Sequence, residues 1–189
     1  MALLNRRPRL AVIARRLGLG LGLVVLVALS AKAQAGSADE HSVKAAYLYN
    51  FAKFVEWPEE AGNPGTPLVI AVFGKDDFGA VLKQTVHGET VNGRAISVRS
   101  VSRVEDLRSC QILFFGSSNQ NRLAEVLRAT EGASVLTVGE TDEFIRLGGV
   151  IAFVAEGNKI RFEINLAAAR RNRLTISAKL LRVAIGVRE

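Results

Sequence analysis

The sequence predicts one α/β domain, in which helices flank a single layered, mixed and mostly parallel β-sheet that closes with a C-terminal hairpin and helix. Three apolar runs, at 68–74, 111–116 and 133–139, each end in glycine, and a segment with helical spacing follows each run. Unbroken apolar runs of this length are typical of strands buried on both faces of a parallel sheet. Strands that alternate with helices predict right-handed crossovers and helical layers over the sheet.

The first 35 residues have the composition of a secretory signal peptide. Five arginines precede an apolar run at 17–29, and the small residues Ala31, Ala33 and Ala35 follow it. A basic leader, a short apolar core and a small-residue exit are the parts of such a signal. The apolar run is shorter than the ~20 residues that cross a bilayer. We therefore expect a periplasmic protein whose signal is cleaved near residue 33 or 35; an uncleaved anchor is the alternative.

The net charge of the secreted part argues against nucleic acid as a partner. The whole chain has 25 basic and 18 acidic residues, a net charge of +7. Residues 1–35 hold six of the basic residues and no acidic residue, which leaves 19 basic against 18 acidic residues and a net charge of +1. So small an excess does not provide the positive field that binds phosphates, and we expect no nucleic-acid partner.

The remaining part of the chain is long enough for one domain with its own core. Residues 36–42 form a polar lead-in, and the domain is expected at 43–189. Ser42 is the expected N-cap of a first helix that runs to about Glu56. Pro58 ends that helix, because a proline pushes the residue before it out of the α region.

Local patterns predict the elements that follow. Apolar residues at helical spacing indicate three further helices, at 76–86, 118–130 and 142–147. Asn92-Gly93 predicts a turn before an alternating strand, and Gly157-Asn158 predicts a tight hairpin over 150–166. The tail, 166–186, is expected to be helical with a break near 172–177.

No catalytic or metal-binding constellation emerges, so we expect neither an enzyme nor a cofactor nor a metal. The two histidines, His41 and His87, are not spaced as zinc ligands, and no P-loop, nucleophile elbow or dinucleotide fingerprint is present. Asp76-Asp77 suits the first turn of a helix, with Mg²⁺ binding as the alternative. The single cysteine, Cys110, lies in an apolar strand pattern, which predicts a buried structural thiol.

Ser117 and Ser118 occupy the turn after the second apolar run. A strand-to-helix turn of this kind can bind an anion through its backbone N–H groups, but an ordinary helix cap has the same sequence. Both serines are candidates for ligand contact or for a polar network. A hydrolase built on either serine would need a histidine base, and neither histidine is near in sequence.

The strand at 159–165 alternates between apolar and polar residues, so its polar side chains share one face. This is either a solvated sheet face or a recognition surface, where a guanidinium and a carboxylate make directional contacts. The neighbouring basic helix end suits a helix dipole and is otherwise solvated. We predict five partner-binding residues: Trp57, Arg161, Glu163, Asn165 and Arg170.

The first predicted helix is apolar along two stripes, one along 43–57 and the other along 48–55. Such a helix is buried on both sides, or is buried on one side and docks a partner on the other. Asn50 and Lys53 would be costly inside it if they were buried without partners. We therefore expect polar partners for both from the strand at 159–165, as a ligand-binding or polar network.

Several motifs together resemble the YfiR-like family of small periplasmic proteins. They are VKAAYLYNFAKFVEWP (43–58), CQILFFGSS (110–118) and KIRFEINLAAARRNRLTISAKLLRVA (159–184), and the likeness extends over about 43–187. The resemblance implies a non-enzymatic regulator that represses an inner-membrane diguanylate cyclase by binding its periplasmic region. Lower cyclic-di-GMP output and less biofilm would follow. Cysteine pairs used in this family for stability and redox response cannot carry over, because this chain has one cysteine.

Alternatives remain open at this stage. The membrane partner could be a kinase instead of a cyclase, and an exposed aromatic face would favour a homodimer. The protein could also be a stand-alone small-ligand sensor. Its ligand would then lie at the carboxyl ends of the strands, near Gly74, Gly116 and Gly139.

Overall fold

The computed structural model describes residues 40–61, 65–74 and 77–189. The chain divides into two compact units, Met1–Glu40 and His41–Glu189, and the second contains the α/β domain. The predicted signal peptide and the start of the polar lead-in lie outside the described residues. No helix in the described ranges is long and apolar enough to span a membrane.

The main sheet has eight strands and confirms the predicted mixed, mostly parallel α/β architecture. In spatial order the strands are β10 (Gly186–Arg188), β8 (Lys159–Asn165), β7 (Ile151–Glu156), β6 (Leu136–Gly139), β5 (Ile112–Phe115), β2 (Leu68–Phe73), β4 (Arg94–Val101) and β3 (Thr90–Val91). The five central strands, from β7 to β4 in this order, run parallel. Antiparallel pairs join β7 to β8 and β4 to β3, and the edge strand β10 lies parallel to β8.

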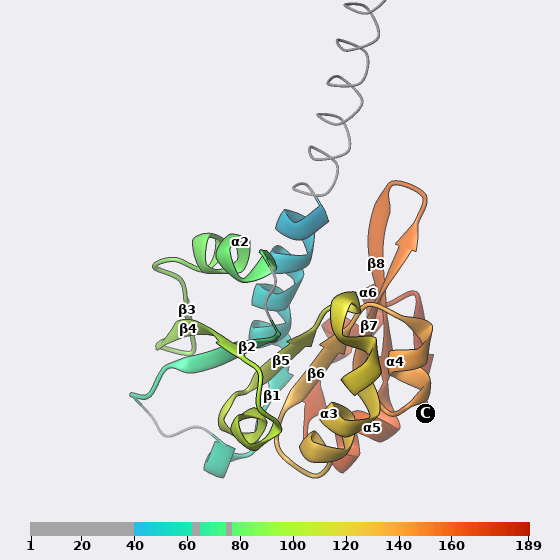
Figure 1. Cartoon of the computed structure of the whole chain (residues 1–189). Coiled ribbons are helices and arrows are strands. Elements are labelled where there is room, and N and C mark those ends of the chain that lie inside the picture. Colours follow the sequence, from blue (N-terminus) through green and yellow to red (C-terminus); the bar gives the residue numbers. More distant parts are fainter. Residues whose placement is uncertain (1–39, 62–64, 75–76) are drawn as a thin grey trace, which may run out of the picture. The chain divides into compact units, whose positions relative to one another are not determined.

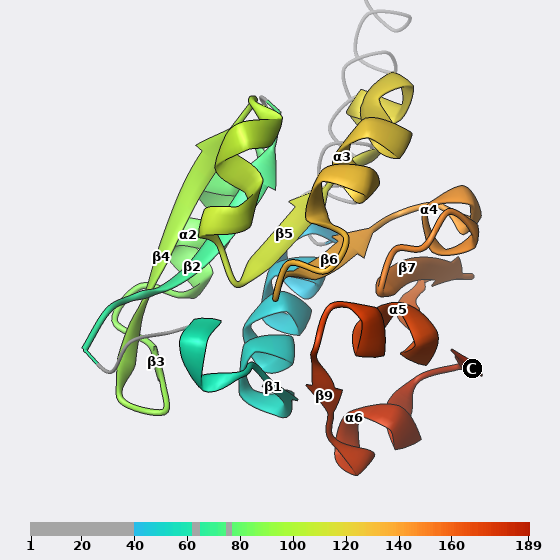
Figure 2. The ribbon, with the colours of Figure 1, turned by 90° about the horizontal axis from the view of Figure 1, so that it is seen from below.

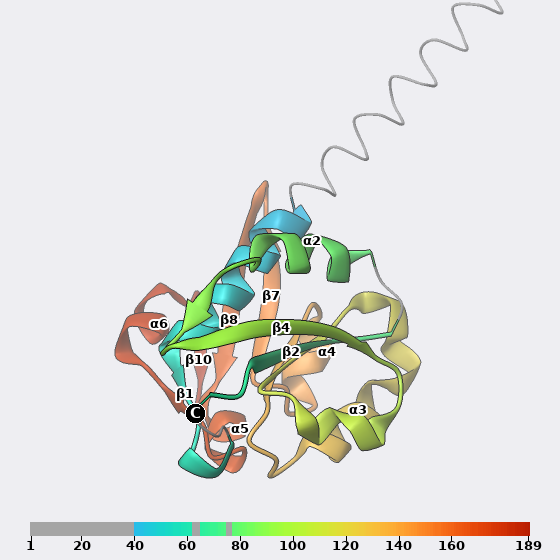
Figure 3. The ribbon, with the colours of Figure 1, turned by 90° about the vertical axis from the view of Figure 1, so that its left-hand side faces the viewer.

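The two faces of the sheet bury separate cores (Figures 1 and 3). The helix at 40–54, α2 (Phe78–Thr85) and α6 (Ala178–Val183) pack on one face, and α5 (Leu166–Arg171) adds two buried alanines to the same core. The 3₁₀ helix η2 (Val104–Ser109), α3 (Leu123–Thr130) and α4 (Asp142–Arg146) cover the other face. We call these the first and the second face.

Aromatic rings explain the composition of the first helix. Phe51 is fully buried, and its ring centroid lies 5.0 Å from that of Phe162 and 5.9 Å from that of Phe153. Tyr47 stacks beside Phe51 and donates a hydrogen bond to the carbonyl of Ile160 at 3.2 Å. Ring pairs at such distances add to the apolar burial. The helix is therefore fixed onto the β7–β8 hairpin.

Both predicted turns, at Asn92-Gly93 and at Gly157-Asn158, are confirmed. Asn92 and Gly93 both have positive φ, +51° and +78°, as a tight turn with two left-handed residues requires, and the turn joins β3 to β4. Gly157 and Asn158 join β7 to β8. Thr141 caps α4 by accepting a hydrogen bond from the amide of Phe144.

Other boundaries differ from the prediction. Residues 40–42 are already helical, so Ser42 is not the N-cap, and the helix ends at residue 54. Val55–Glu56 forms the short strand β1, paired antiparallel with β9 (Thr175–Ile176), as Figure 2 shows. These pairs join segments about 120 residues apart, which local patterns do not reveal.

The helix expected at 118–130 begins with a 3₁₀ segment, η3 (Ser117–Arg122), before α3. The tail has the predicted break, but it ends in β10 instead of a helix. A short 3₁₀ turn, η1 (Glu59–Ala61), follows Pro58.

Candidate partner-binding surface

The polar face of β8 has the predicted alternation. Phe162 and Ile164 are buried in the core of the first face, so Arg161 and Glu163 lie on the second. Glu163 accepts two hydrogen bonds from Arg188 on β10, at 2.8 and 3.1 Å, and keeps 24% of its side chain exposed. A Cβ on Gly186 would meet the Glu163 side chain at 3.3 Å. Glu163 therefore holds the edge strand β10 in place.

The Arg161 side chain makes a long ion pair but no hydrogen bond through its Nε. Its Nε lies 3.9 Å from a carboxylate oxygen of Glu156, too far for a hydrogen bond, and it has no hydrogen-bond partner in the structure. The side chain remains 43% exposed. The Nε atom is itself buried, so a partner would contact the exposed part of the side chain, where a guanidinium can bind a carboxylate or carbonyl.

Asn165 and Arg170 differ in their roles. The Asn165 side chain caps α5, where its Oδ1 accepts from the amide of Ala168 at 2.9 Å, and its Nδ2 donates to the carbonyl of Ile145 at 3.4 Å. Both of its polar atoms thus serve the fold. Arg170 is exposed in the last turn of α5.

Trp57 is not brought together with Arg161 and Glu163. Its indole Nε1 donates to the carbonyl of Gln111 at 3.1 Å, and its ring packs against the core of the first face. Arg161 and Glu163 lie on the opposite face, three strands away from β5. Trp57 therefore belongs to a separate, half-buried position beside Gln111.

The predicted polar network of Asn50 and Lys53 is wrong. Both residues are exposed. The Asn50 Nδ2 donates to the carbonyl of Ala46 in its own helix, and the Lys53 Nζ lies 4.9 Å from the centroid of the Tyr49 ring. Of the two apolar stripes, only the one that contains Leu48 and Phe51 is fully buried, so neither polar residue needs a partner from β8.

The turn at Ser117 does bind a carboxylate, but one from the protein itself. The Ser117 amide donates to a Glu140 oxygen at 2.8 Å, and the other oxygen of Glu140 accepts from Lys44. The side chains of Lys44 and Glu140 are only 8% and 15% exposed. Sequence reasoning missed this pair, because the two residues lie 96 positions apart and neither belongs to a motif.

Ser118 contacts the residue that follows it in the chain. Its hydroxyl accepts a hydrogen bond from the Asn119 side chain at 2.9 Å. The ring of His41 packs edge-on against Phe78 at 5.6 Å. Within the described ranges, no three histidine, cysteine or acidic side chains gather as metal ligands do.

The space near the strand-ending glycines is filled. The strand order changes direction at β2, between β4 and β5, which is where open α/β sheets bind ligands. At Gly74, whose φ is +90°, a Cβ would overlap the side chain of Asn119, and at Gly139 it would overlap the ring of Phe144. At these two glycines the protein's own side chains occupy the position next to the backbone, so no room for a ligand remains directly against either one.

Apolar side chains are exposed next to the β8 polar face. Val183 at the end of α6 is 58% exposed, and Ile185 and Val187 along the edge strand are 40% and 41% exposed. Val187 pairs with Ile164, so these aliphatic residues lie on the first face, across the edge from the polar residues of β8. We call the surface that wraps around this edge the C-terminal edge surface; it comprises Arg161, Glu163, Val183, Ile185 and Val187. An edge strand with apolar side chains and open backbone groups is a typical docking site for another chain.

Comparison with known proteins now places this domain. Residues 41–185 match the family model described as YfiR/HmsC-like, DUF4154. The chain belongs to the YfiR/HmsC-like family. The match covers both faces of the sheet and the residues of the predicted site.

Two solved structures are similar at low sequence identity. One is a conserved domain protein from Vibrio cholerae O1 biovar El Tor, with 14% identity and a TM-score of 0.49, over 64% of this chain and 55% of that one. The other is an ABC domain in complex with L-Trp from Streptococcus pneumoniae, with 12% identity and a TM-score of 0.45, over 65% of this chain and 55% of that one. This chain thus spans about half the length of the structures it matches.

YfiR-like membership supports a periplasmic regulator in diguanylate cyclase signalling. The family is regulatory and non-catalytic, and its members act with a membrane signalling partner. Binding by such a protein depends on its exposed surfaces and not on a buried cluster of catalytic residues.

Proposed function

We propose that this protein represses an inner-membrane diguanylate cyclase by binding its periplasmic region, which lowers cyclic-di-GMP synthesis. The observation that carries the proposal is the YfiR/HmsC-like match over nearly the whole α/β domain. A membrane signalling protein of another kind, such as a kinase, is the variant of this proposal that the test below separates.

The C-terminal edge surface supports the proposal as the docking site. It combines an edge strand, three exposed aliphatic side chains and the half-exposed Arg161 side chain. Exposed apolar area contributes binding energy, and a guanidinium adds direction. Arg170 is exposed and extends the candidate set, whereas Asn165 acts by holding α5 in place.

The test measures cellular cyclic-di-GMP in a strain that lacks the gene and is complemented with variants. We expect the deletion to raise cyclic-di-GMP and the unaltered chain to restore it. Arg161→Ala combined with Val187→Glu should fail to restore it while accumulating normally, since both positions are exposed. Arg146→Ala, an exposed arginine on α4, is the matched control and should restore repression.

Co-purification identifies the partner. Light cross-linking in the native host, followed by mass spectrometry, should recover an inner-membrane cyclase with the unaltered chain and not with the double variant. Recovery of a kinase would change the output, and an unchanged cyclic-di-GMP level in the deletion strain would overturn the proposal.

The stand-alone sensor remains a second candidate function because the domain has a pocket of about 440 Å³. The pocket lies at the edge of the sheet opposite to the one predicted for a ligand.

A further inference from the structure

A pocket of about 440 Å³ opens at the amino ends of β5 and β6. Polar and charged residues from the ends of η2 and α5 and from the segment before β6 line it. They include Glu60, Arg108, Ser109, Cys110, Ser134 and Arg173. The volume is within the range of small-molecule sites.

Arg173 has a backbone conformation that favours glycine. It follows the C-cap of α5 with φ +56°, in the left-handed region. The Arg173 amide donates to the carbonyl of Arg170, and the Leu174 amide donates to that of Ala169. This is a Schellman ending, in which glycine usually occupies the left-handed position. The fold is less stable with arginine than with glycine at this position, which suggests that the arginine side chain has a function.

The Arg173 guanidinium lines the pocket without a carboxylate partner. One of its nitrogens reaches the carbonyl of Gly132 at 3.4 Å, the limit of a hydrogen bond. Arg108, on the same pocket, uses its Nε to donate to the carbonyl of Ala129 at 3.0 Å. Among the described residues, no carboxylate lies within ion-pair distance of either guanidinium. Two guanidinium groups therefore line one pocket, and each has further N–H groups that can donate hydrogen bonds to a ligand.

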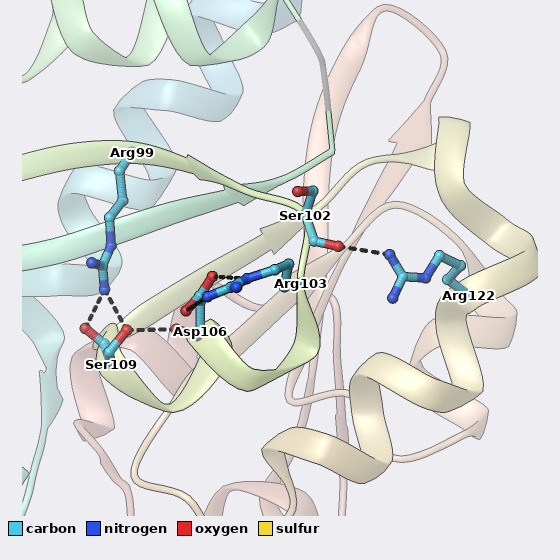
Figure 4. A network of polar contacts seen from close by, with 6 residues as sticks. All are labelled: Arg99, Ser102, Arg103, Asp106, Ser109 and Arg122. Carbon is cyan, nitrogen blue, oxygen red and sulfur yellow. Dashed lines mark hydrogen bonds and ion pairs between the residues drawn. The ribbon is translucent and has the colours of Figure 1, made fainter.

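Arginines also bind the polar groups of the η2 segment that carries Arg108 (Figure 4). Arg99 donates to the carbonyl and hydroxyl oxygens of Ser109, both at 2.6 Å. The Asp106 carboxylate accepts hydrogen bonds from the Nε and Nη2 of Arg103, both at 3.0 Å. Burial raises the pKa of the Cys110 thiol to about 12, so this lining residue is uncharged at neutral pH. Glu60 is the one carboxylate among the lining residues named for this pocket.

We propose that this pocket binds a small anionic ligand whose carboxylate or phosphate group lies between Arg108 and Arg173. The Ser134 hydroxyl would accept or donate a further hydrogen bond, whereas the Ser109 hydroxyl already donates to the carbonyl of Asp106 and accepts from Arg99. Guanidinium groups suit both anions because their paired donors match two oxygens. This site shares no residue with the C-terminal edge surface, and the observations that point to it do not rest on the proposed repression.

The experiment is isothermal titration of the purified protein with inorganic phosphate and, separately, with citrate, in a buffer without other multivalent anions. We expect saturable binding of at least one anion. Phosphate alone would indicate a phosphorylated ligand, and citrate alone a carboxylate. Arg173→Gly and Arg108→Gln should each weaken binding about tenfold or more, the effect of losing one charge-assisted hydrogen bond.

Arg173→Gly also carries its own folding control. The variant should melt at the same temperature as the unaltered chain or higher, because glycine relieves the left-handed backbone. Arg182→Gln, which removes an exposed arginine on α6, should leave binding unchanged. Absence of saturable binding by both anions, or full binding by Arg173→Gly, would overturn the proposal.

Discussion

Lys44 and Glu140 tie the first helix to the end of β6 through a nearly buried ion pair. Glu140 also receives the amide of Ser117, so three separate segments meet at one carboxylate. A buried carboxylate that loses its cation remains without compensation, which is costly in a poorly solvated site.

Lys44→Met should therefore lower the free energy of unfolding by about 3 kcal/mol. Lys53→Met, on the same helix but exposed, should change it by less than about 0.5 kcal/mol. Urea denaturation of both variants gives the comparison. Equal effects at the two positions would show that the ion pair does not stabilise the domain.

The Cys110 thiol is buried and donates to the carbonyl of Leu107, which confirms the predicted structural role. With its pKa raised to about 12, mainly by burial, almost no thiolate exists at pH 8. A thiol reagent should then react with the native protein far more slowly than with the protein in urea. Fast native labelling would contradict the burial.

The same shift predicts a pH dependence of stability. The folded state holds the Cys110 proton more tightly than the unfolded chain does, whose thiol has a pKa near ~8.5. This contribution to stability is complete below that value and is lost as the pH rises toward about 12. Cys110→Ala should show a shallower alkaline decline in unfolding free energy than the unaltered chain.

At the scale of elements, one side-chain pair, Glu163 with Arg188, reinforces the backbone pairing of β10 with β8. Glu163→Lys places a cation beside Arg188 in place of its partner, so β10 should separate from β8. We expect faster hydrogen exchange at the amides of 185–188 with little change in global melting, because the pair is partly exposed. Glu59→Lys, an exposed charge reversal on η1, is the control. Loss of the whole fold by Glu163→Lys would show that the core depends on this pair.

Element prediction succeeded where one segment carries its own signal. The apolar runs of β2, β5 and β6 and the Gly157-Asn158 turn indicate buried strands and a hairpin without any distant contact. It failed for β1, β9 and β10, which have two or three residues each and exist only through pairing with a distant strand.

The candidate site shows the same division. The alternation correctly predicts that Arg161 and Glu163 share one face of β8. It does not reveal that Arg188 pairs with Glu163, because the pattern of the tail predicts a helix and not the strand β10. Helical periodicity likewise could not decide which stripe of the first helix is buried. The sequence therefore predicts polar partners for Asn50 and Lys53, although both residues are exposed and need none.

For the whole molecule, one cysteine limits how redox conditions can act. No disulfide can form within a single chain, and Cys110 is buried. The thermal midpoint should thus be the same with and without a reductant, measured by scanning calorimetry. A reductant-dependent midpoint or a covalent dimer on a non-reducing gel would contradict this expectation.

Arg173 also has a genetic consequence. Every arginine codon becomes a glycine codon by one nucleotide substitution, and glycine is the more stable residue in its left-handed position. A library selected only for protein abundance should therefore enrich the Arg173→Gly allele. A library selected for regulation in the host should remove it if the pocket is used, so the two selections would diverge at a single codon.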